Sequence, residues 1–356
     1  AGALASTERG LSGTVTHGWD QFRRPVGIGN DPARLLSANG SNRWIWWREA
    51  AGAFSDRPVA GWGAGSFPIV HYQYREYASQ VRSVHDVPLQ FLAEGGLIGA
   101  LLGLGGVGLL GAAAVRTTRS PTTTDRAARV ALLAAGAAWG VHCLVDWDWE
   151  IPALTLPALA ALAIAASPWK EGRRWLDPSP PTDPRRRLNE VLSLPAAIAA
   201  ALLAVVIAVS AELPALSEHR RLEALTKAAE APPGDVKALD PAIDEALSAH
   251  RLNPLDENAA FAAAALEQQA NDLAAARELL LGAARTQPDN YRVWDQLLNF
   301  AMLTGDTELA RTAFQRRLAT EPLSFAQEPE LAAARAFSLE VPAELSPTAF
   351  GTPPEH

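Results

Sequence analysis

The chain has 356 residues, of which 31 are basic and 39 acidic, so its formal net charge is −8. The negative charge is concentrated after residue 211, where 23 acidic residues outnumber 12 basic ones. This balance argues against nucleic-acid binding, which needs a basic surface. The single cysteine, Cys143, excludes an internal disulfide and a zinc site built from cysteines.

The first 91 residues predict a large polar loop. Residues 1–40 are rich in Gly, Ser and Asn and show no sustained hydrophobic period, so we expect irregular structure there. Residues 43–55 then place tryptophan and other apolar side chains at helical spacing, which predicts a short amphipathic helix suited to a membrane surface. Pro58 is expected to end that helix.

Four uncharged apolar runs follow the loop. They cover residues 95–115, 130–145, 151–169 and 191–211, with lengths of 21, 16, 19 and 21 residues. About 20 residues are needed to cross a hydrocarbon core, so we expect four transmembrane helices within residues 92–211, the second of them completed by flanking interfacial residues. Buried helices of a soluble core are the alternative, but four such runs in so short a stretch disfavour it.

The loops between the apolar runs predict the orientation in the membrane. One basic island contains Arg116, Arg119, Arg126 and Arg129, and the other contains Lys170, Arg173, Arg174, Arg185, Arg186 and Arg187. The link at 146–150, DWDWE, is acidic. Because positive loops stay in the cytoplasm, both islands are expected inside, and residues 1–91, the acidic link and everything after 211 outside.

The region 212–340 predicts a helical repeat domain. Pro254, Pro288 and Pro322 are each 34 residues apart, and Ala276-Arg277 recurs as Ala310-Arg311 at the same offset. A 34-residue period resembles that of tetratricopeptide repeats, which form α-solenoids. The last segment, 341–356, is rich in Pro and Thr and is expected to be disordered.

Residues 41–99 hold the most informative pattern in the chain. An Arg and a Trp (Arg43, Trp47) precede a Pro-x-x-Gly-x-Gly-x-Gly-x-Phe turn that begins at Pro58. His85 and a Leu-x-x-Leu-x-Glu-x-Gly-x-x-Gly run over 89–99 follow. In order and spacing this pattern resembles the large outward-facing loop of the O-antigen ligase and polymerase family of membrane glycosyltransferases. The resemblance covers roughly residues 41–165.

The resemblance implies a multi-pass protein of the inner membrane that moves a saccharide from an undecaprenyl-diphosphate-linked donor to a glycan or lipid acceptor outside the cytoplasm, without a cofactor or metal. It implies Arg43 as the cation facing the leaving diphosphate and His85 as the base. Asp146 is expected to orient a catalytic group. The substrate-binding residues are expected to be Trp47, Arg48, Gly61, Gly63, Gly65 and Arg82. Asp86 stands where the family often has Asn.

Each assignment has a structural alternative. Arg43 can reach lipid headgroups, His85 can cap the following helix, Asp146 can be a hydrated loop residue, and the glycines can form a turn without touching a ligand. For the whole protein, the alternative is a membrane-anchored scaffold whose repeats recruit envelope proteins without catalysis. A transporter is disfavoured because the apolar runs are nearly free of polar residues. A ligase and a polymerase present the same loop. A chain that opens on an outward loop is expected to be the C-terminal part of a longer protein and inactive alone.

Overall fold

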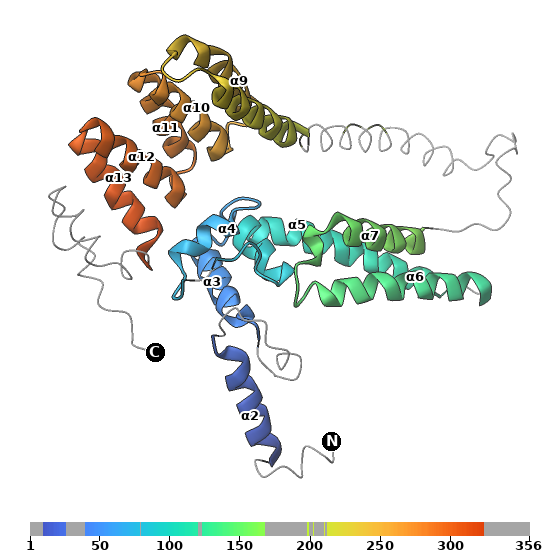
Figure 1. Cartoon of the computed structure of the whole chain (residues 1–356). Coiled ribbons are helices and arrows are strands. Elements are labelled where there is room, and N and C mark those ends of the chain that lie inside the picture. The colour runs from blue at the N-terminus through green and yellow to red at the C-terminus, as the bar shows by residue number, and fades with distance from the viewer. Residues whose placement is uncertain are drawn as a thin grey trace, which may run out of the picture. The chain divides into compact units, whose positions relative to one another are not determined.

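A computed structural model describes residues 10–25, 40–78, 80–119, 123–167 and 212–323, together with the single positions 198, 202 and 210. All regular elements in these ranges are helices, as the sequence predicts (Figure 1). The chain divides into two compact units. The first comprises Ala1–Trp169 with Glu321–Ser324, and the second comprises Lys170–Thr320 with Phe325–His356.

The first unit opens with a helix, α2 (Gly10–Arg23), in a region where we expected irregular structure. That expectation was wrong because it rested on the Gly, Ser and Thr content and did not take into account two aromatic residues about one helical turn apart. Trp19 and Phe22 stack with ring centroids 5.7 Å apart, and they contact Trp44 and Trp47 of the next helix at 5.2 and 5.6 Å. Aromatic packing of this kind overrides the weak helix propensity of the segment.

Helix α3 (Arg43–Asp56) is the predicted helix before Pro58. Its alanines Ala50 and Ala53 pack into a small core with Phe67, Val70 and Val84. Phe67 and Val70 belong to the short helix α4 (Phe67–Val70), which runs into the 3-10 turn η2 (His71–Gln73). The polar loop is therefore a folded subdomain with its own buried centre.

Helix α5 (Val87–Thr117) begins eight residues before the apolar run that predicted it, inside the segment assigned to the loop. Asp86 sets the start, because its Oδ1 accepts a hydrogen bond from the Leu89 N–H at 2.8 Å. Gly96 interrupts the helix with a φ of 59°, which produces a kink. Among the described helices, α5 is the one long and apolar enough to cross a membrane.

Helices α6 (Thr123–His142) and α7 (Pro152–Ala166) pack with α5, and the 3-10 turn η3 (Asp148–Glu150) joins them (Figure 1). Helix α6 is partly polar because it starts in the basic island, and α7 is apolar but has only 15 residues. The fourth apolar run, 191–211, lies outside the described residues, as does most of the second basic island. The four-helix bundle therefore stays a prediction.

The second unit consists of paired helices. A helix over residues 212–230 packs on α9 (Asp240–Leu252) after the 3-10 turn η4 (Val236–Leu239). The Ser217 hydroxyl donates to the Ala249 carbonyl at 2.9 Å, and Arg220 and Lys227 both bond Glu245. This pair precedes the helices that follow the 34-residue period.

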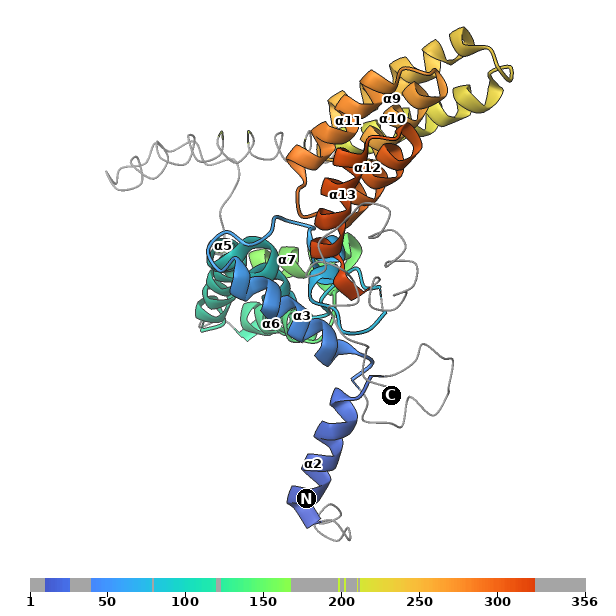
Figure 2. The same ribbon diagram turned by 90° about the vertical axis from the view of Figure 1, so that its left-hand side faces the viewer.

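The remaining helices follow the predicted period. Helix α12 (Tyr291–Thr304) begins 34 residues after α10 (Glu257–Gln269), and α13 (Thr307–Thr320) begins 34 residues after α11 (Leu273–Thr286) (Figure 2). Ala276 and Ala310, the repeated small residues, are buried with Leu297 and Phe314 in one core. The assignment of these pairs to the tetratricopeptide class stays a prediction, and residues 324–356 lie outside the described ranges.

Candidate functional site

Three side chains from distant parts of the sequence meet at one point of the first unit. Arg43 is the first residue of α3, His85 lies two residues before the start of α5, and Asp146 follows α6. The His85 Nδ1 lies 2.9 Å from Asp146 Oδ1, and the Arg43 Nη2 lies 3.2 Å from Asp146 Oδ2. The three residues predicted to carry the chemistry therefore form one continuous network.

The network is open to solvent. The side chains of His85 and Asp146 are each 22% exposed, and that of Arg43 is 29% exposed. A ligand can therefore reach them, while burial is sufficient to hold the groups in place.

The backbone and two tryptophans hold His85 in an unusual position. Its φ is 55°, in the left-handed region that a non-glycine residue enters only when its surroundings favour it. The Trp46 ring stacks on the imidazole with centroids 4.9 Å apart, and the Trp47 indole N–H donates to the His85 carbonyl at 3.4 Å. The predicted substrate-binding residue Trp47 thus supports the histidine from behind.

Asp146 is the centre of the network. Its Oδ1 also accepts the Trp147 backbone N–H at 2.9 Å. Burial raises the pKa of Asp146, but the hydrogen bonds from Trp147 and His85 and the charge of Arg43 outweigh burial, so the pKa lies below its usual value. Asp146 is therefore a carboxylate near neutral pH, and it is placed to accept the Nδ1 proton of His85.

With Nδ1 bonded to Asp146, the other ring nitrogen of His85, Nε2, is left to serve a ligand. This arrangement fixes one tautomer of the neutral imidazole, with a lone pair on Nε2. Arg43 uses one N–H in its bond to Asp146, although a guanidinium carries five. Its Nε is buried and has no hydrogen-bond partner. The site therefore combines an oriented base with a cation that has N–H donors not used in its bond to Asp146.

The glycine turn and the start of α5 form one structural unit beside this network. Glu94 receives the Gly65 and Phe67 N–H groups on its carboxylate at 2.9 and 3.2 Å, and its carbonyl accepts the Gly63 N–H at 2.8 Å. Gly61 and Gly96 approach so closely that a Cβ on Gly61 would lie 2.3 Å from the Glu94 carbonyl oxygen. Both glycines also have positive φ. A side chain at either position would therefore clash with the facing backbone and strain its own backbone.

This packing changes the interpretation of the three glycines that we expected to bind substrate. The Gly61 N–H donates to the Arg57 carbonyl at 3.0 Å, and those of Gly63 and Gly65 donate to Glu94. An amide engaged in the protein is not a donor for phosphate. The structure therefore uses these glycines to fix the loop on the kinked helix.

The remaining predicted residues lie apart from the network. Arg48 is on another side of α3 and forms a two-bond ion pair with Glu76, at 2.7 and 3.4 Å. Arg82 is exposed, three residues before His85. Sequence reasoning missed Glu49 and His71, a buried pair near Arg48. A carboxylate on the apolar side of a helix was the signal that could have revealed it.

Residues 10–104 match the family model described as O-Antigen ligase. The match covers about a quarter of the chain, begins where α2 begins and includes Arg43, His85 and the glycine turn. It supports a glycan ligase or polymerase-like role at a membrane. No curated protein is significantly similar to the chain.

The matched segment ends within α5, so Asp146 and the repeats lie beyond it. The link between the matched segment and Asp146 comes from the fold. The Val87 N–H donates to the Cys143 carbonyl at 2.9 Å, which ties the start of α5 to the turn that carries Asp146.

Proposed function

We propose that this protein transfers a saccharide from an undecaprenyl-diphosphate-linked donor to the hydroxyl of an acceptor at the outer face of the cytoplasmic membrane. The observation that carries the proposal is the Arg43–Asp146–His85 network, in which a cation and a base share one carboxylate. Glycosyl transfer from a diphosphate needs these two groups, because charge grows on the leaving diphosphate while a proton leaves the acceptor.

His85 would act as the base. The acceptor hydroxyl would give its proton to Nε2, and its oxygen would form the new bond to the anomeric carbon of the donor sugar. The bond from that carbon to the diphosphate oxygen would break, and its electron pair would leave with the diphosphate. Asp146, held to Nδ1, would stabilise the imidazolium that results.

Arg43 would stabilise the departing group. A guanidinium is always charged and offers planar paired donors that match phosphate oxygens. Its single bond to Asp146 holds it in place while its other N–H groups are available. A fixed cation of this kind acts where charge develops in the transition state.

An outer-face location fits the length of α5. The 21 residues that follow the kink at Gly96 extend over about 31 Å, enough to cross the hydrocarbon core between the His85 end and the arginines Arg116 and Arg119. We expect a cysteine at Gln80, which is exposed, to react with a membrane-impermeant maleimide in intact cells, and one at Thr118 not to react. The buried Cys143 should contribute no background. Labelling at Thr118 alone would reverse the orientation.

The direct test is transfer in membranes that contain the full-length protein, the lipid-linked donor and an acceptor. Loss of long glycan chains in a deletion strain would identify a polymerase, and intact chains left on the lipid carrier would identify a ligase. The second candidate, a membrane-anchored scaffold that binds an envelope protein, is favoured by the paired helices of α9 to α13. If this second candidate is right, glycan transfer should be normal in the deletion strain, and the repeat helices alone should bind the envelope protein.

A further inference from the structure

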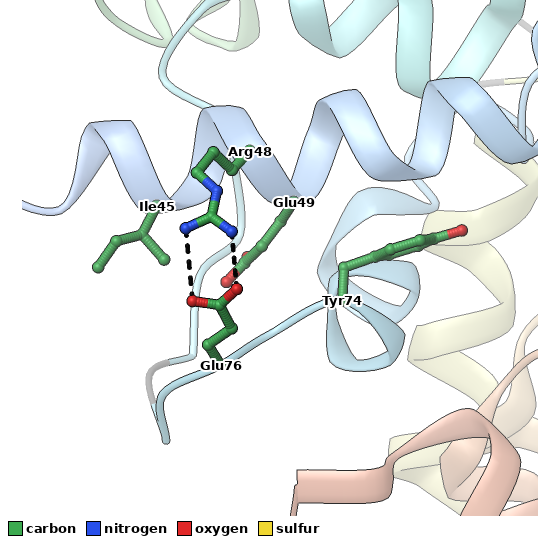
Figure 3. A pocket seen from close by; sticks show the side chains of 5 residues that line it. All are labelled: Ile45, Arg48, Glu49, Tyr74 and Glu76. Carbon is green, nitrogen blue, oxygen red and sulfur yellow. Dashed lines mark hydrogen bonds and ion pairs between the residues drawn. The ribbon is translucent and has the colours of Figure 1, made fainter. Parts of the chain in front are cut away.

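A small pocket lies on the side of α3 that faces away from the Arg43 network. Ile45, Arg48 and Glu49 of α3 line it together with Tyr74 and Glu76, and it has a volume of about 100 Å³ (Figure 3). At 3.6 residues per turn, Arg48 is rotated from Arg43 by about 140° around the helix, and Glu49 by about 120° in the opposite sense. The pocket is thus separate from the candidate catalytic groups.

Glu49 lies at the buried side of this pocket and lacks the partners that a carboxylate needs. Its side chain is 3% exposed, and neither carboxyl oxygen has a hydrogen-bond partner. His71 Nδ1 lies 3.4 Å from Glu49 Oε2, but without hydrogen-bond geometry. A buried carboxylate without donors is costly, so a group that brings donors into the pocket would be favoured there.

The rim carries both donors and acceptors. Arg48 and Glu76 lie side by side with their planar ends paired, and each side chain is 55% exposed (Figure 3). Such an exposed pair contributes little to stability and its free edges face solvent. Ile45 and the ring of Tyr74, whose hydroxyl donates to Asp56 at 2.6 Å, add apolar surface beside them.

The chemistry of these groups selects the class of ligand. A phosphate would meet two carboxylates and one guanidinium that is already neutralised by Glu76. A simple cation would meet Arg48, and an apolar ligand would leave Glu49 without donors. A sugar ring suits all of the groups, because its hydroxyls both donate and accept and its C–H face packs on apolar side chains.

We propose that the Glu49–Arg48–Glu76 pocket binds a sugar unit of the glycan, remote from the reacting bond. Hydroxyls of this sugar donate to Glu49 and Glu76 and accept from Arg48. The inference rests on the proposed glycan transfer for its biological ligand, but the binding itself is independent of Arg43 and His85. It assigns Arg48, which the sequence predicts to bind substrate, to a sugar unit and not to the reacting diphosphate.

The test is saturation-transfer NMR on the purified full-length protein with glucose, galactose, mannose, rhamnose and N-acetylglucosamine as probes. At least one sugar should bind saturably. Its Kd should rise about tenfold or more in Glu49→Gln and in Glu76→Gln, since each loses a hydrogen bond to a charged acceptor. Inorganic diphosphate should not compete. Glu76 is exposed, so its variant keeps the test valid even if Glu49→Gln does not fold.

The matched control is Glu278→Gln, which removes a carboxylate from another exposed ion pair, 2.7 Å from Arg285 in the second unit, and should leave sugar binding unchanged. His85→Ala should lose transfer but bind sugar normally, so failure of the catalytic proposal and failure of the pocket are distinguishable. Absence of saturable binding by all five sugars, equal effects of Glu76→Gln and Glu278→Gln, or competition by diphosphate would overturn the inference.

Discussion

Two histidine–carboxylate pairs adjoin helix α3, and they differ in access and geometry. His85 and Asp146 are 2.9 Å apart with hydrogen-bond geometry, are partly exposed and have Arg43 beside them. His71 and Glu49 are 3.4 Å apart without that geometry and are almost completely buried. Only the first pair can fix a tautomer, exchange a proton with a ligand and share a cation.

The contrast between these two pairs shows which observation identifies a catalytic histidine in this fold. Proximity of a carboxylate is common to both pairs, so it does not discriminate between them. Solvent access and a hydrogen bond to only one ring nitrogen discriminate between them, because they leave the second nitrogen free to exchange a proton with a ligand. We therefore expect substitutions at the first pair to change the rate and substitutions at His71 to change stability.

His85→Ala should have the largest effect on transfer. Removal of a general base lowers turnover by roughly 10²–10⁴-fold. The amount of membrane-inserted protein should stay near wild type, because the side chain is partly exposed. Rates must be normalised to inserted protein. A wild-type rate in this variant would eliminate His85 as the base.

Arg43→Lys should lower turnover by about 10²–10³-fold, although it keeps the positive charge. A lysine offers a point charge without the planar fork, so it cannot hold Asp146 and a phosphate oxygen in the same way. Donor binding should weaken less than turnover, because the contact strengthens as the diphosphate leaves. Full rescue by lysine would show that only charge matters at this position.

Asp146→Asn should lower turnover, because a carboxylate bonded to a histidine base holds its tautomer and stabilises the imidazolium. The amide can accept from Nδ1 but cannot stabilise the imidazolium by charge. Asp146→Glu should recover part of the activity. Equal rates for wild type and Asp146→Asn would remove the carboxylate from the mechanism.

The depressed pKa of Asp146 makes stability depend on pH. The pKa is below its usual value in the folded protein, so the ionised form of Asp146 contributes stability above the usual carboxyl value of about 3.9, and this contribution is lost as pH falls through the lower, folded value. The free energy of unfolding should therefore fall more steeply with acid in wild type than in Asp146→Asn, and parallel curves for the two proteins would contradict this contribution.

Much of this arrangement could be predicted from the sequence because it depends on local pattern. The helix before Pro58, the apolar helix α5 and the 34-residue spacing of the repeat helices all follow from periodicity and helix-breaking residues. Arg43 and His85 were selected by their motif. Asp146 was expected to orient a catalytic group, but its contact with both residues was not predictable from spacing, since it requires α6 to return to the start of α5.

Other features depended on tertiary contacts that no pattern encodes. Helix α2 is stabilised by aromatic packing on α3, so its composition gave no signal. The glycines of the turn were expected to bind substrate, but Glu94 and the Arg57 carbonyl engage their amides. Glu49 and His71 are 22 positions apart, and only the fold brings them together.

His71→Ala should have the smallest effect on the rate and a clear effect on stability. It leaves a cavity beside the buried Glu49 side chain, which costs about 2–5 kcal/mol of unfolding free energy. His142→Ala is the matched control. His142 lies 2.5 Å from Asp148, but its side chain is 55% exposed, and exposed pairs contribute only about 0–1 kcal/mol.

Thermal unfolding of the purified proteins should rank wild type and His142→Ala together, well above His71→Ala. Transfer per folded molecule should be similar in all three. A lower rate in His71→Ala at full stability would show that the buried pair also takes part in the reaction.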